Sequence, residues 1–337
     1  MVKKTTVRKQ TFLITGGAGF IGSHLSDLIL GEGHRVLVID NLSSGRMENI
    51  EHLLKHPAFH FARADIMHDA LVLDRLASQS DVIIHLAAAV GVEKIISQPV
   101  ETIETNIGGT EAVLRTAVRY RCRTLIASTS EVYGKGARLP FAEDDSVVLG
   151  PTSRNRWAYA ASKMVDEFLG LAYLHEYGLP VVLARLFNTV GPRQTGRYGM
   201  VIPRFVGQAL RGEPITVYGS GKQSRCFCDV ADVAPALYGL SLHPGAQGKV
   251  VNIGGREEIG MRKLAEKVKA VTGSDSPITL IPYHKAYGPG FEDMYRRVPD
   301  TSRVEQLLGW KPKISLDRTL ERVRDHMAAE IARAKPA

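Results

Sequence analysis

The chain has little cysteine: its 337 residues include three, Cys122, Cys226 and Cys228. So small and odd a number argues against a disulfide framework and for a reducing compartment, and it predicts a cytoplasmic location. Cys226 and Cys228 are not followed by a second Cys or His pair at zinc-binding spacing, so we expect them to pack in the interior. We therefore predict no metal site and no scaffold that depends on cross-links.

The sequence also lacks a long apolar run. Nowhere do about 18 uninterrupted apolar residues occur, which excludes a membrane-spanning helix. The apolar segment behind the basic N-terminal residues covers only residues 11–15 before glycines interrupt it, which is too short for the core of a signal peptide. The net charge of +8 comes from Lys and Arg interspersed with acids, so we expect anionic phosphate ligands and no nucleic-acid partner.

The first half of the chain alternates short apolar segments with amphipathic ones, the pattern of a parallel sheet with helices on both faces. We predict an α/β fold with a Rossmann-type, doubly wound parallel sheet. Helices are expected near residues 19–30, 100–119 and 157–177, and Gly178 is a stop signal for the last of these. Strands are expected at residues 12–15, 35–39, 59–62, 82–86, 124–127, 181–184 and 250–253.

Beyond Arg185 the alternation loosens, because glycines and prolines break the chain into short elements. Such a segment suits a smaller lobe that closes over a ligand at the carboxyl ends of the strands. We therefore predict a Rossmann domain of residues 1–185 with about 226–256, interleaved with a C-terminal substrate lobe of residues 186–225 with about 257–337. A final helix is expected from about Leu316 to Ala334, with Ser315 as its N-cap.

A glycine-rich turn follows the first expected strand. Gly16, Gly19 and Gly22 stand at G-x-x-G-x-x-G spacing ahead of a helix, where glycine permits a tight turn and lets a pyrophosphate approach the backbone N–H groups. The second strand ends in Asp40, 18 residues after Gly22, where a carboxylate can accept both adenosine ribose hydroxyls. Because Asp40 would repel a 2′-phosphate, this pattern favours NAD over NADP.

Tyr159 and Lys163 lie four residues apart on an expected helix, so their side chains share one face. An ammonium beside the phenol, with a cationic nicotinamide nearby, would favour phenolate and turn a group with a pKa of about 10 into a usable base. A hydroxyl from the end of a strand, Thr129 or a neighbouring serine, would share the proton network. The pattern predicts a hydride-transfer site.

Together these residues resemble the extended short-chain dehydrogenase/reductase family, in its NAD-dependent branch of nucleotide-sugar epimerases, dehydratases and decarboxylases. The likeness covers nearly the whole chain. It is carried by TGGAGFIG at 15–22, DNLSSG at 40–45, Asp65-Ile66, HLAA at 85–88, Asn106, STSEVYG at 128–134, YAASK at 159–163, RLFNTVGPR at 185–193 and RRVPD at 296–300.

The resemblance implies NAD as cofactor and a nucleotide-sugar as substrate, and it assigns residues to both. Asp65 and Ile66 would border the adenine. The full set expected at the cofactor is Gly16, Gly19, Phe20, Ile21, Gly22, Asp40, Asn41, Ser43, Gly45, Asp65, Ile66, Leu86, Ala87, Ala88, Asn106, Tyr159 and Lys163.

For the reaction itself, the resemblance implies catalytic roles for Thr129, Ser130, Glu131, Tyr159 and Lys163. In the smaller lobe it implies that Asn188, Arg225 and Arg297 hold the diphosphate, and that Thr216 to Tyr218 border the nucleobase, with Val201 also in contact with the substrate. Arginine suits this task because its planar guanidinium offers donors in a fixed geometry to a charged phosphate.

All branches of this family imply a common first step, in which Tyr159 takes the proton of the sugar 4-hydroxyl while hydride passes from C4 to NAD. An epimerase then returns hydride to the opposite face of the 4-keto sugar. A 4,6-dehydratase removes the C5 proton and expels the C6 hydroxyl. A decarboxylase acts on a glucuronate, whose C6 carboxylate becomes a β-keto acid and leaves as carbon dioxide.

Glu131 favours a decarboxylase or a dehydratase, because epimerases of this branch usually carry a small residue there, and Ser130 stands where dehydratases often have a second acid. Residues 222–227 and 290–297 resemble bacterial UDP-glucuronate decarboxylases, whereas residues 155–157 and 194–199 resemble 4-epimerases. We predict a UDP-glucuronate decarboxylase that forms UDP-xylose or a related 4-keto pentose, with the 4-epimerase and then the 4,6-dehydratase as alternatives.

Outside enzymes, the alternative is a non-catalytic relative that binds a dinucleotide or RNA. The presence of Thr129, Tyr159 and Lys163 together argues against it. The resemblance further implies a homodimer, in which the helices near 100–119 and 157–177 pair with their copies as a four-helix bundle.

Overall fold

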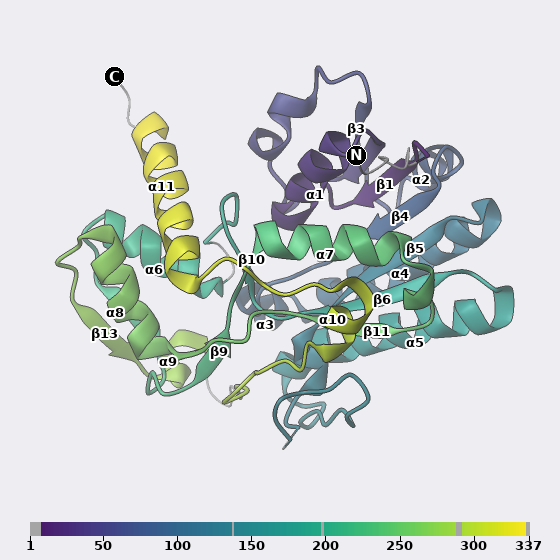
Figure 1. Ribbon diagram of the computed structural model, residues 1–337. Helices are drawn as coiled ribbons and strands as arrows, with labels where there is room; N and C mark the ends of the chain where they lie inside the picture. Colours follow the sequence, from purple (N-terminus) through teal and green to yellow (C-terminus); the bar gives the residue numbers. More distant parts are fainter. Residues whose placement is uncertain (1–7, 137, 197–198, 288–291, 335–337) are drawn as a thin grey trace.

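The computed structural model describes residues 8–136, 138–196, 199–287 and 292–334. Most of the basic N-terminal tail, residues 197–198 of the 194–199 stretch and residues 290–291 of the 290–297 stretch lie outside the described residues. Figure 1 shows a larger body built around a sheet, with a smaller lobe beside it that contains α6, α8 and β13.

A seven-stranded sheet forms the centre of the larger body, with all neighbouring strands parallel, in the order β11-β6-β5-β4-β1-β2-β3. The order reverses between β1 and β4, which opens a crevice at the carboxyl ends of these strands. The seven expected strands are confirmed, with ends shifted by up to two residues. They are β1 (Thr11–Thr15), β2 (Arg35–Asp40), β3 (Phe59–Arg63), β4 (Val82–His85), β5 (Arg123–Thr129), β6 (Val181–Leu186) and β11 (Val250–Ile253).

Both faces of the sheet are covered, which explains why its strands read as continuous apolar runs. Phe12 and Ile14 of β1 belong to the core on the side of α1 (Phe20–Gly31) and α7 (Val230–Leu242). Leu13, between them, belongs to the core on the opposite side. The helices on that side are α2 (Ala70–Ala77), α4 (Pro99–Tyr120) and α5 (Ala158–Tyr177).

The helix ends follow local sequence signals. Gly178 ends α5 with a φ of +66°, a left-handed conformation that glycine adopts without steric cost. At the start of α11 (Leu316–Ala334), the Ser315 hydroxyl accepts the Arg318 N–H at 3.3 Å. Both signals were expected, and both are confirmed.

The smaller lobe has its own apolar core, formed by α6 (Val201–Leu210), α8 (Met261–Thr272) and α11 together with short strands. The expected lobe boundaries stay a prediction, although α10 (Ser302–Leu308), placed in the smaller lobe on the basis of sequence, contacts α7 and β11 of the larger body. The short strands pair as β8 (Ile215–Tyr218) with β13 (Ile278–Ile281), β9 (Ser224–Cys226) with β12 (Glu258–Gly260), and β7 (Thr189–Val190) with β10 (Cys228–Asp229).

Short helical elements join these parts: α3 (Val92–Ser97), α9 (Tyr283–Tyr287) and, beside the site described below, the 3₁₀ turns η3 (Ser130–Tyr133) and η4 (Asn155–Trp157). Cys122, Cys226 and Cys228 are buried with free thiols. None of the helices in the described ranges combines the length and the apolar character that crossing a membrane requires.

Candidate active site

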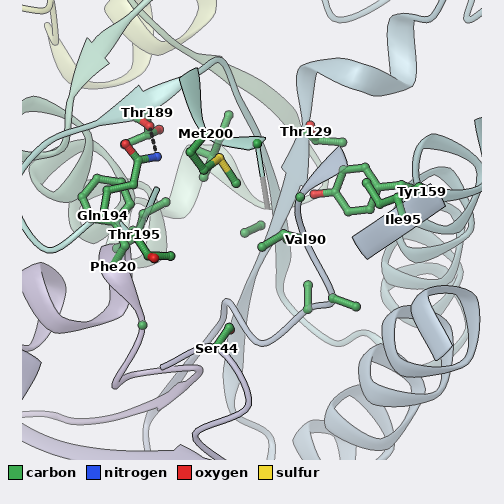
Figure 2. A pocket seen from close by; sticks show the side chains of 18 of the residues that line it. Phe20, Ser44, Val90, Ile95, Thr129, Tyr159, Thr189, Gln194, Thr195 and Met200 are labelled. Atoms are coloured by element: carbon green, nitrogen blue, oxygen red, sulfur yellow. Dashed lines mark hydrogen bonds between the residues drawn. The ribbon is translucent and has the colours of Figure 1, made fainter. Parts of the chain in front are cut away.

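A cavity of about 690 Å³ lies at the carboxyl ends of the central strands and extends into the smaller lobe. Its wall includes residues at or just after the ends of β1, β2, β4 and β5, and residues of α6 and β8. Figure 2 shows Phe20 and Ser44 on one side of this space and Tyr159 with Thr129 on another. Ligands of open parallel sheets bind in such a crevice, at the point where the strand order reverses.

The glycine-rich turn after β1 has no room for a side chain at two positions. Gly16 has a φ of +72°, and a Cβ there would lie 2.8 Å from the Ala87 backbone nitrogen. A Cβ on Gly22 would lie 2.4 Å from the Gly16 carbonyl oxygen. The turn leads into α1, whose N-cap Gly19 carries no capping side chain, so the N-terminus of this helix can receive a phosphate. The residues present therefore fit the pyrophosphate of a dinucleotide.

Asp40 lies at the end of β2 and faces the same cavity. Its Oδ2 accepts the Ala18 N–H at 2.9 Å and its Oδ1 accepts the Leu42 N–H at 2.8 Å. Burial raises the pKa of this carboxyl, and the hydrogen bonds from Leu42 and Ala18 counteract that rise. Gly45 packs behind it, since a Cβ there would lie 2.8 Å from both carboxylate oxygens. The carboxylate is thus held in a fixed position at the edge of the cavity.

Of the expected site residues, Gly45, Asn106, Thr216 and Val217 do not line the cavity. Asn106 supports its wall from behind, because its Oδ1 accepts the Ala89 N–H at 2.8 Å. The others do line it: Gly16, Gly19, Phe20, Ile21, Gly22, Asp40, Asn41, Ser43, Asp65, Ile66, Leu86, Ala87, Ala88, Thr129, Ser130, Glu131, Tyr159, Lys163, Asn188, Val201, Tyr218, Arg225 and Arg297.

Tyr159, on the first turn of α5, directs its hydroxyl toward Thr129 at the end of β5 (Figure 2). Burial raises the pKa of this phenol above its ordinary value, and the negative charge of Glu131 raises it further, while a hydrogen bond with Thr129 lowers it. The resting form is therefore the neutral phenol. A positive charge must lie nearby for Tyr159 to act as a base.

Lys163 lines the same cavity but is bonded elsewhere than expected. Its ammonium donates to Asp166 Oδ2 at 2.7 Å, and both side chains are almost completely buried. No hydrogen bond joins Lys163 to Tyr159 in the described part of the chain. The helix explains the contact with Asp166, because residues three apart lie on one face.

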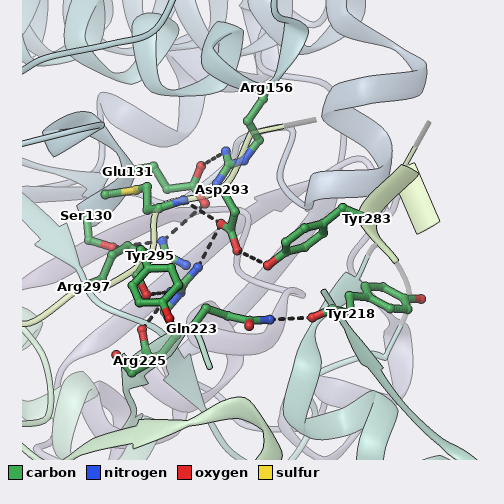
Figure 3. A network of polar contacts seen from close by, with 12 residues as sticks. Ser130, Glu131, Arg156, Tyr218, Gln223, Arg225, Tyr283, Asp293, Tyr295 and Arg297 are labelled. Atoms are coloured by element: carbon green, nitrogen blue, oxygen red, sulfur yellow. Dashed lines mark hydrogen bonds and ion pairs between the residues drawn. The ribbon is translucent and has the colours of Figure 1, made fainter. Parts of the chain in front are cut away.

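Glu131 lies in η3 between two arginines, as Figure 3 shows. One carboxylate oxygen pairs with Arg156 of η4, and the other lies 3.3 Å from Arg297 Nη1, which also contacts the Ser130 hydroxyl at 3.4 Å. Burial would raise the pKa of Glu131, but the charges of Arg156 and Arg297 outweigh burial and hold the pKa at about 2. Glu131 is therefore an ionised carboxylate at neutral pH.

Arg225 is held by a second carboxylate. Its Nη2 donates to Asp293 Oδ1 at 2.9 Å, and the Tyr283 hydroxyl donates to Asp293 Oδ2 at 2.9 Å (Figure 3). Burial is the main cause that lowers the pKa of Arg297, and the charge of Arg225 lowers it further, to about 10. The two guanidinium groups lie close enough to repel each other, so this part of the cavity favours an anionic ligand.

Flat surfaces for a ring are present near Tyr218. The Arg204 guanidinium lies 3.9 Å from the centre of the Tyr218 ring, and the rings of Tyr218 and Tyr287 meet edge to face with centres 5.3 Å apart. Such surfaces suit a nucleobase. The expected contact of Tyr218 with the base stays a prediction.

The sequence reasoning did not assign several residues in or beside the cavity to the site, among them Arg156, Asp166, Arg204 and Asp293. Arg156 carries a signal that could have revealed it, because it stands three residues before Tyr159 and so within one helical turn of it. Arg204 and Asp293 carry none, since their partners are distant in the sequence.

Known proteins resemble this chain along most of its length. The sequence model of the GDP-mannose 4,6 dehydratase family matches residues 13–323. The chain is 40% identical over 317 residues to UDP-N-acetyl-alpha-D-glucosaminuronate decarboxylase of Bacillus cytotoxicus, and the alignment covers 93% of this chain and 96% of that one. It is 38% identical over 323 residues to UDP-glucuronic acid decarboxylase 1 of Danio rerio, covering 96% of this chain and 74% of that one.

Among solved structures, the fold is similar to that of UDP-glucuronic acid 4-epimerase of Bacillus cereus, crystallised with UDP-glucuronic acid and NAD. The TM-score is 0.85 and the identity 28%, with 95% of this chain and 99% of that one covered. The match extends over both the parallel sheet and the smaller lobe. The chain belongs to the GDP-mannose 4,6 dehydratase family, within the extended short-chain dehydrogenase/reductases that its motifs resemble.

Proposed function

We propose that this chain is an NAD-dependent nucleotide-sugar decarboxylase, which oxidises the sugar of a UDP-uronate at C4, releases C6 as carbon dioxide and reduces the ketone again. The observation that carries this proposal is the position of Glu131 between Arg156 and Arg297, in the same cavity as Tyr159. The relatives named as decarboxylases of UDP-glucuronic acid and of its N-acetylated analogue support the same reaction.

The charges of this cluster suit a uronate. Two arginines face one carboxylate, which leaves an excess of one positive charge. The Nε–H groups of Arg156 and Arg297 are buried, and neither has a hydrogen-bond partner in the described ranges. Buried donors without acceptors are unfavourable. The C6 carboxylate of a uronate would supply both the missing charge and the missing acceptors.

The first step is oxidation at C4. Bound NAD supplies a hydride acceptor at C4 and later returns the hydride. Tyr159 takes the proton of the 4-hydroxyl, and Thr129 holds the phenol oxygen toward the cavity. Lys163 provides positive charge one helical turn from Tyr159, which favours the phenolate during transfer.

The second step breaks the C5–C6 bond. The C4 ketone makes the C6 carboxylate a β-keto acid, so C6 leaves as carbon dioxide and its bonding electrons pass into an enolate over C5, C4 and O4. C5 then takes up a proton, and Tyr159 returns its proton to O4 as C4 is reduced, so one proton is consumed overall. With a pKa of about 2, Glu131 stays ionised and orients Arg297 instead of donating a proton.

A 4-epimerase is the second candidate. The similar solved structure is an epimerase that binds UDP-glucuronic acid and NAD. Epimerisation requires the oxidation step and a rotation of the ketone, but no group to assist the loss of C6. The two arginines around Glu131 could bind a uronate carboxylate in either reaction, so the relatives named as decarboxylases favour the decarboxylase.

The deciding experiment measures carbon dioxide and products from UDP-glucuronate, UDP-N-acetylglucosaminuronate and UDP-glucose, each with purified protein and NAD. We expect carbon dioxide from at least one uronate and a UDP-pentose product by NMR. Inversion at C4 without loss of carbon would establish the epimerase instead. Loss of water with a C6 methyl group in the product would establish a 4,6-dehydratase.

The cofactor assignment rests on Asp40, whose buried carboxylate faces the cavity at the end of β2. A 2′-phosphate there would meet a negative charge at short range. We expect calorimetry to show tighter binding of NAD than of NADP, and the reverse order would remove this assignment.

A homodimer is part of the proposal. α4 and α5 pack against each other, and they expose four apolar side chains: Val100, Ile103, Val165 and Phe168, which are 66%, 39%, 38% and 69% exposed. A copy of the same pair would bury them in a four-helix bundle. Scattering at micromolar concentration should give the mass of a dimer, whereas a monomer would contradict it.

The three unpaired cysteines support the cytoplasm as the location.

A further inference from the structure

A buried carboxylate lies behind Lys163, and the reaction described above does not use it. Asp166 is fully buried, and its Oδ2 accepts from the Lys163 ammonium at 2.7 Å. Burying an acid costs solvation free energy that a single ion pair often fails to recover. The burial of Asp166 next to Lys163, a residue of the site, therefore indicates that this acid contributes to function and not only to stability.

Asp166 lies beside a line of hydrogen bonds that starts at the cofactor edge of the sheet and ends at Thr110. Thr15, the last residue of β1, accepts the Ala87 N–H at 3.2 Å and lies 2.7 Å from His85 Nδ1. His85 Nε2 lies 3.1 Å from the Thr110 hydroxyl, and Thr110 lies close enough to Asp166 to lower the pKa of its carboxyl. All these side chains are buried, so the line is rigid.

The direction of the line follows from the charge of His85. Burial is the main cause that lowers the pKa of His85, and the charge of Lys163 lowers it further, to about 3. The ring is therefore neutral and carries one N–H. If Thr15 donates to Nδ1, the Nε2–H donates to Thr110. Asp166 accepts from Lys163 through Oδ2, whereas its buried Oδ1 has no hydrogen-bond partner in the described ranges, and the pair of Lys163 and Asp166 has no net charge.

The neighbouring acids are already paired. Glu167, next along α5, accepts from Arg185 at 2.7 and 2.9 Å and from the Ser128 hydroxyl at 2.5 Å. Glu131 is paired with Arg156 and Arg297. Within the described ranges, Asp166 is the carboxylate bonded to Lys163.

We propose that Asp166 cancels the charge of Lys163, so that the site does not bind the cationic, oxidised nicotinamide more weakly than the neutral, reduced one. The inference rests on the proposed function, which places hydride transfer beside Tyr159. Because the proton leaves O4 and the hydride leaves the adjacent C4, the nicotinamide must lie near the Tyr159 phenol. Lys163 lies one helical turn from Tyr159. An uncompensated ammonium there would weaken the binding of NAD⁺ by repulsion, whereas it would not repel the neutral nicotinamide of NADH.

The absence of a bias toward the reduced cofactor serves the reaction. Each turnover ends with the cofactor oxidised again, and a protein that favoured NADH would stall whenever the sugar left before the second hydride transfer. The paired Lys163 ammonium uses one N–H on Asp166 and keeps two donors that can stabilise the phenolate of Tyr159, while the pair as a whole adds no charge that would repel the oxidised cofactor.

The test compares dissociation constants of NAD⁺ and NADH, measured by calorimetry on the full chain without sugar. For Asp166→Asn, we expect the affinity for NAD⁺ to fall relative to that for NADH by roughly fivefold to tenfold. Glu167→Gln is the matched control, a buried acid one residue along the same helix, and it should leave the ratio of the two constants unchanged. Asp166→Ala carries the same expectation and replaces the Asn variant if that one does not fold.

An equal loss of affinity for both nucleotides would show that Asp166 only supports the fold, and an unchanged ratio would also overturn the inference. The same shift in Glu167→Gln would remove its specificity. The expected ratio in a protein that releases no carbon dioxide from any uronate would support this inference and refute the proposed reaction. A wild-type protein that binds neither nucleotide would refute both.

Discussion

The two ends of the cavity are constructed differently. At the glycine-rich end, the shape is set by the backbone, since an added Cβ at Gly16 or Gly22 would collide with main-chain atoms. At the other end, the surface is set by charged side chains from separate segments, of which Glu131, Arg156 and Arg297 form one paired group. Ligand binding at the glycine-rich end should therefore be sensitive to added side-chain volume, and ligand binding and catalysis at the other end should be sensitive to a changed side-chain charge.

Tyr159 lies where the two ends meet, and its removal should have the largest effect. Tyr159→Phe deletes the proton acceptor and leaves the ring that packs there. We expect turnover of every sugar to fall by roughly 10³-fold, within the range that general acid–base catalysis contributes. NAD binding by calorimetry should stay within about twofold of wild type, because no binding group is lost. Retained turnover would show that another group accepts the proton.

Replacing Glu131 tests the charged end. Glu131→Ala removes the anion between the two arginines, and Glu131→Gln keeps its shape without its charge. Because Arg297 would lose the partner that orients it, we expect both to slow release of carbon dioxide by roughly 10²-fold, with NADH absorbance or a 4-keto sugar accumulating after the first step. An epimerase would interconvert its sugars with a modest loss, so survival of turnover in both variants would favour that alternative.

The backbone-defined end is tested by Gly22→Ala. The added methyl group would lie 2.4 Å from the Gly16 carbonyl oxygen, so the turn must shift. We expect a loss of NAD affinity of roughly tenfold and a loss of about 1–3 kcal/mol in the free energy of unfolding. Gly31→Ala, at the end of the same helix, is the control, because nothing lies within 4 Å of a Cβ there. Equal behaviour of the two variants would contradict a close-fitting turn.

The smallest effect concerns pH and stability. The pKa of Glu131 is lowered from its ordinary 4.5 to about 2, so its contribution to stability is present above pH 4.5 and is lost as the pH falls toward 2. The difference in unfolding free energy between wild type and Glu131→Gln should therefore shrink over that interval. Denaturant titrations at pH 7, 4 and 3 measure it, and a difference independent of pH would show that Glu131 is not held ionised by its arginines.

The fold was accessible from the sequence because the signals for its main elements are local. The strands were recognisable since both faces of the sheet are covered and most strands are apolar, although the edge strand β3 exposes His60 and Arg63. The helices α6, α7 and α8 were not anticipated. Prolines and glycines precede or interrupt these segments, and Pro235 even lies inside α7, so the breaker residues concealed helices that packing stabilises.

The site divides in the same way. The sequence by itself determined the glycine-rich turn, Asp40, and the helical spacing of Tyr159 and Lys163, because each depends on residues that are near one another in the chain. Only the tertiary structure decided which charges meet. It paired Lys163 with Asp166, Glu131 with Arg156 and Arg225 with Asp293. Apart from the helical pair, these partners lie on different segments, and their electrostatic energy depends on distance in space and on burial, neither of which the order of residues contains.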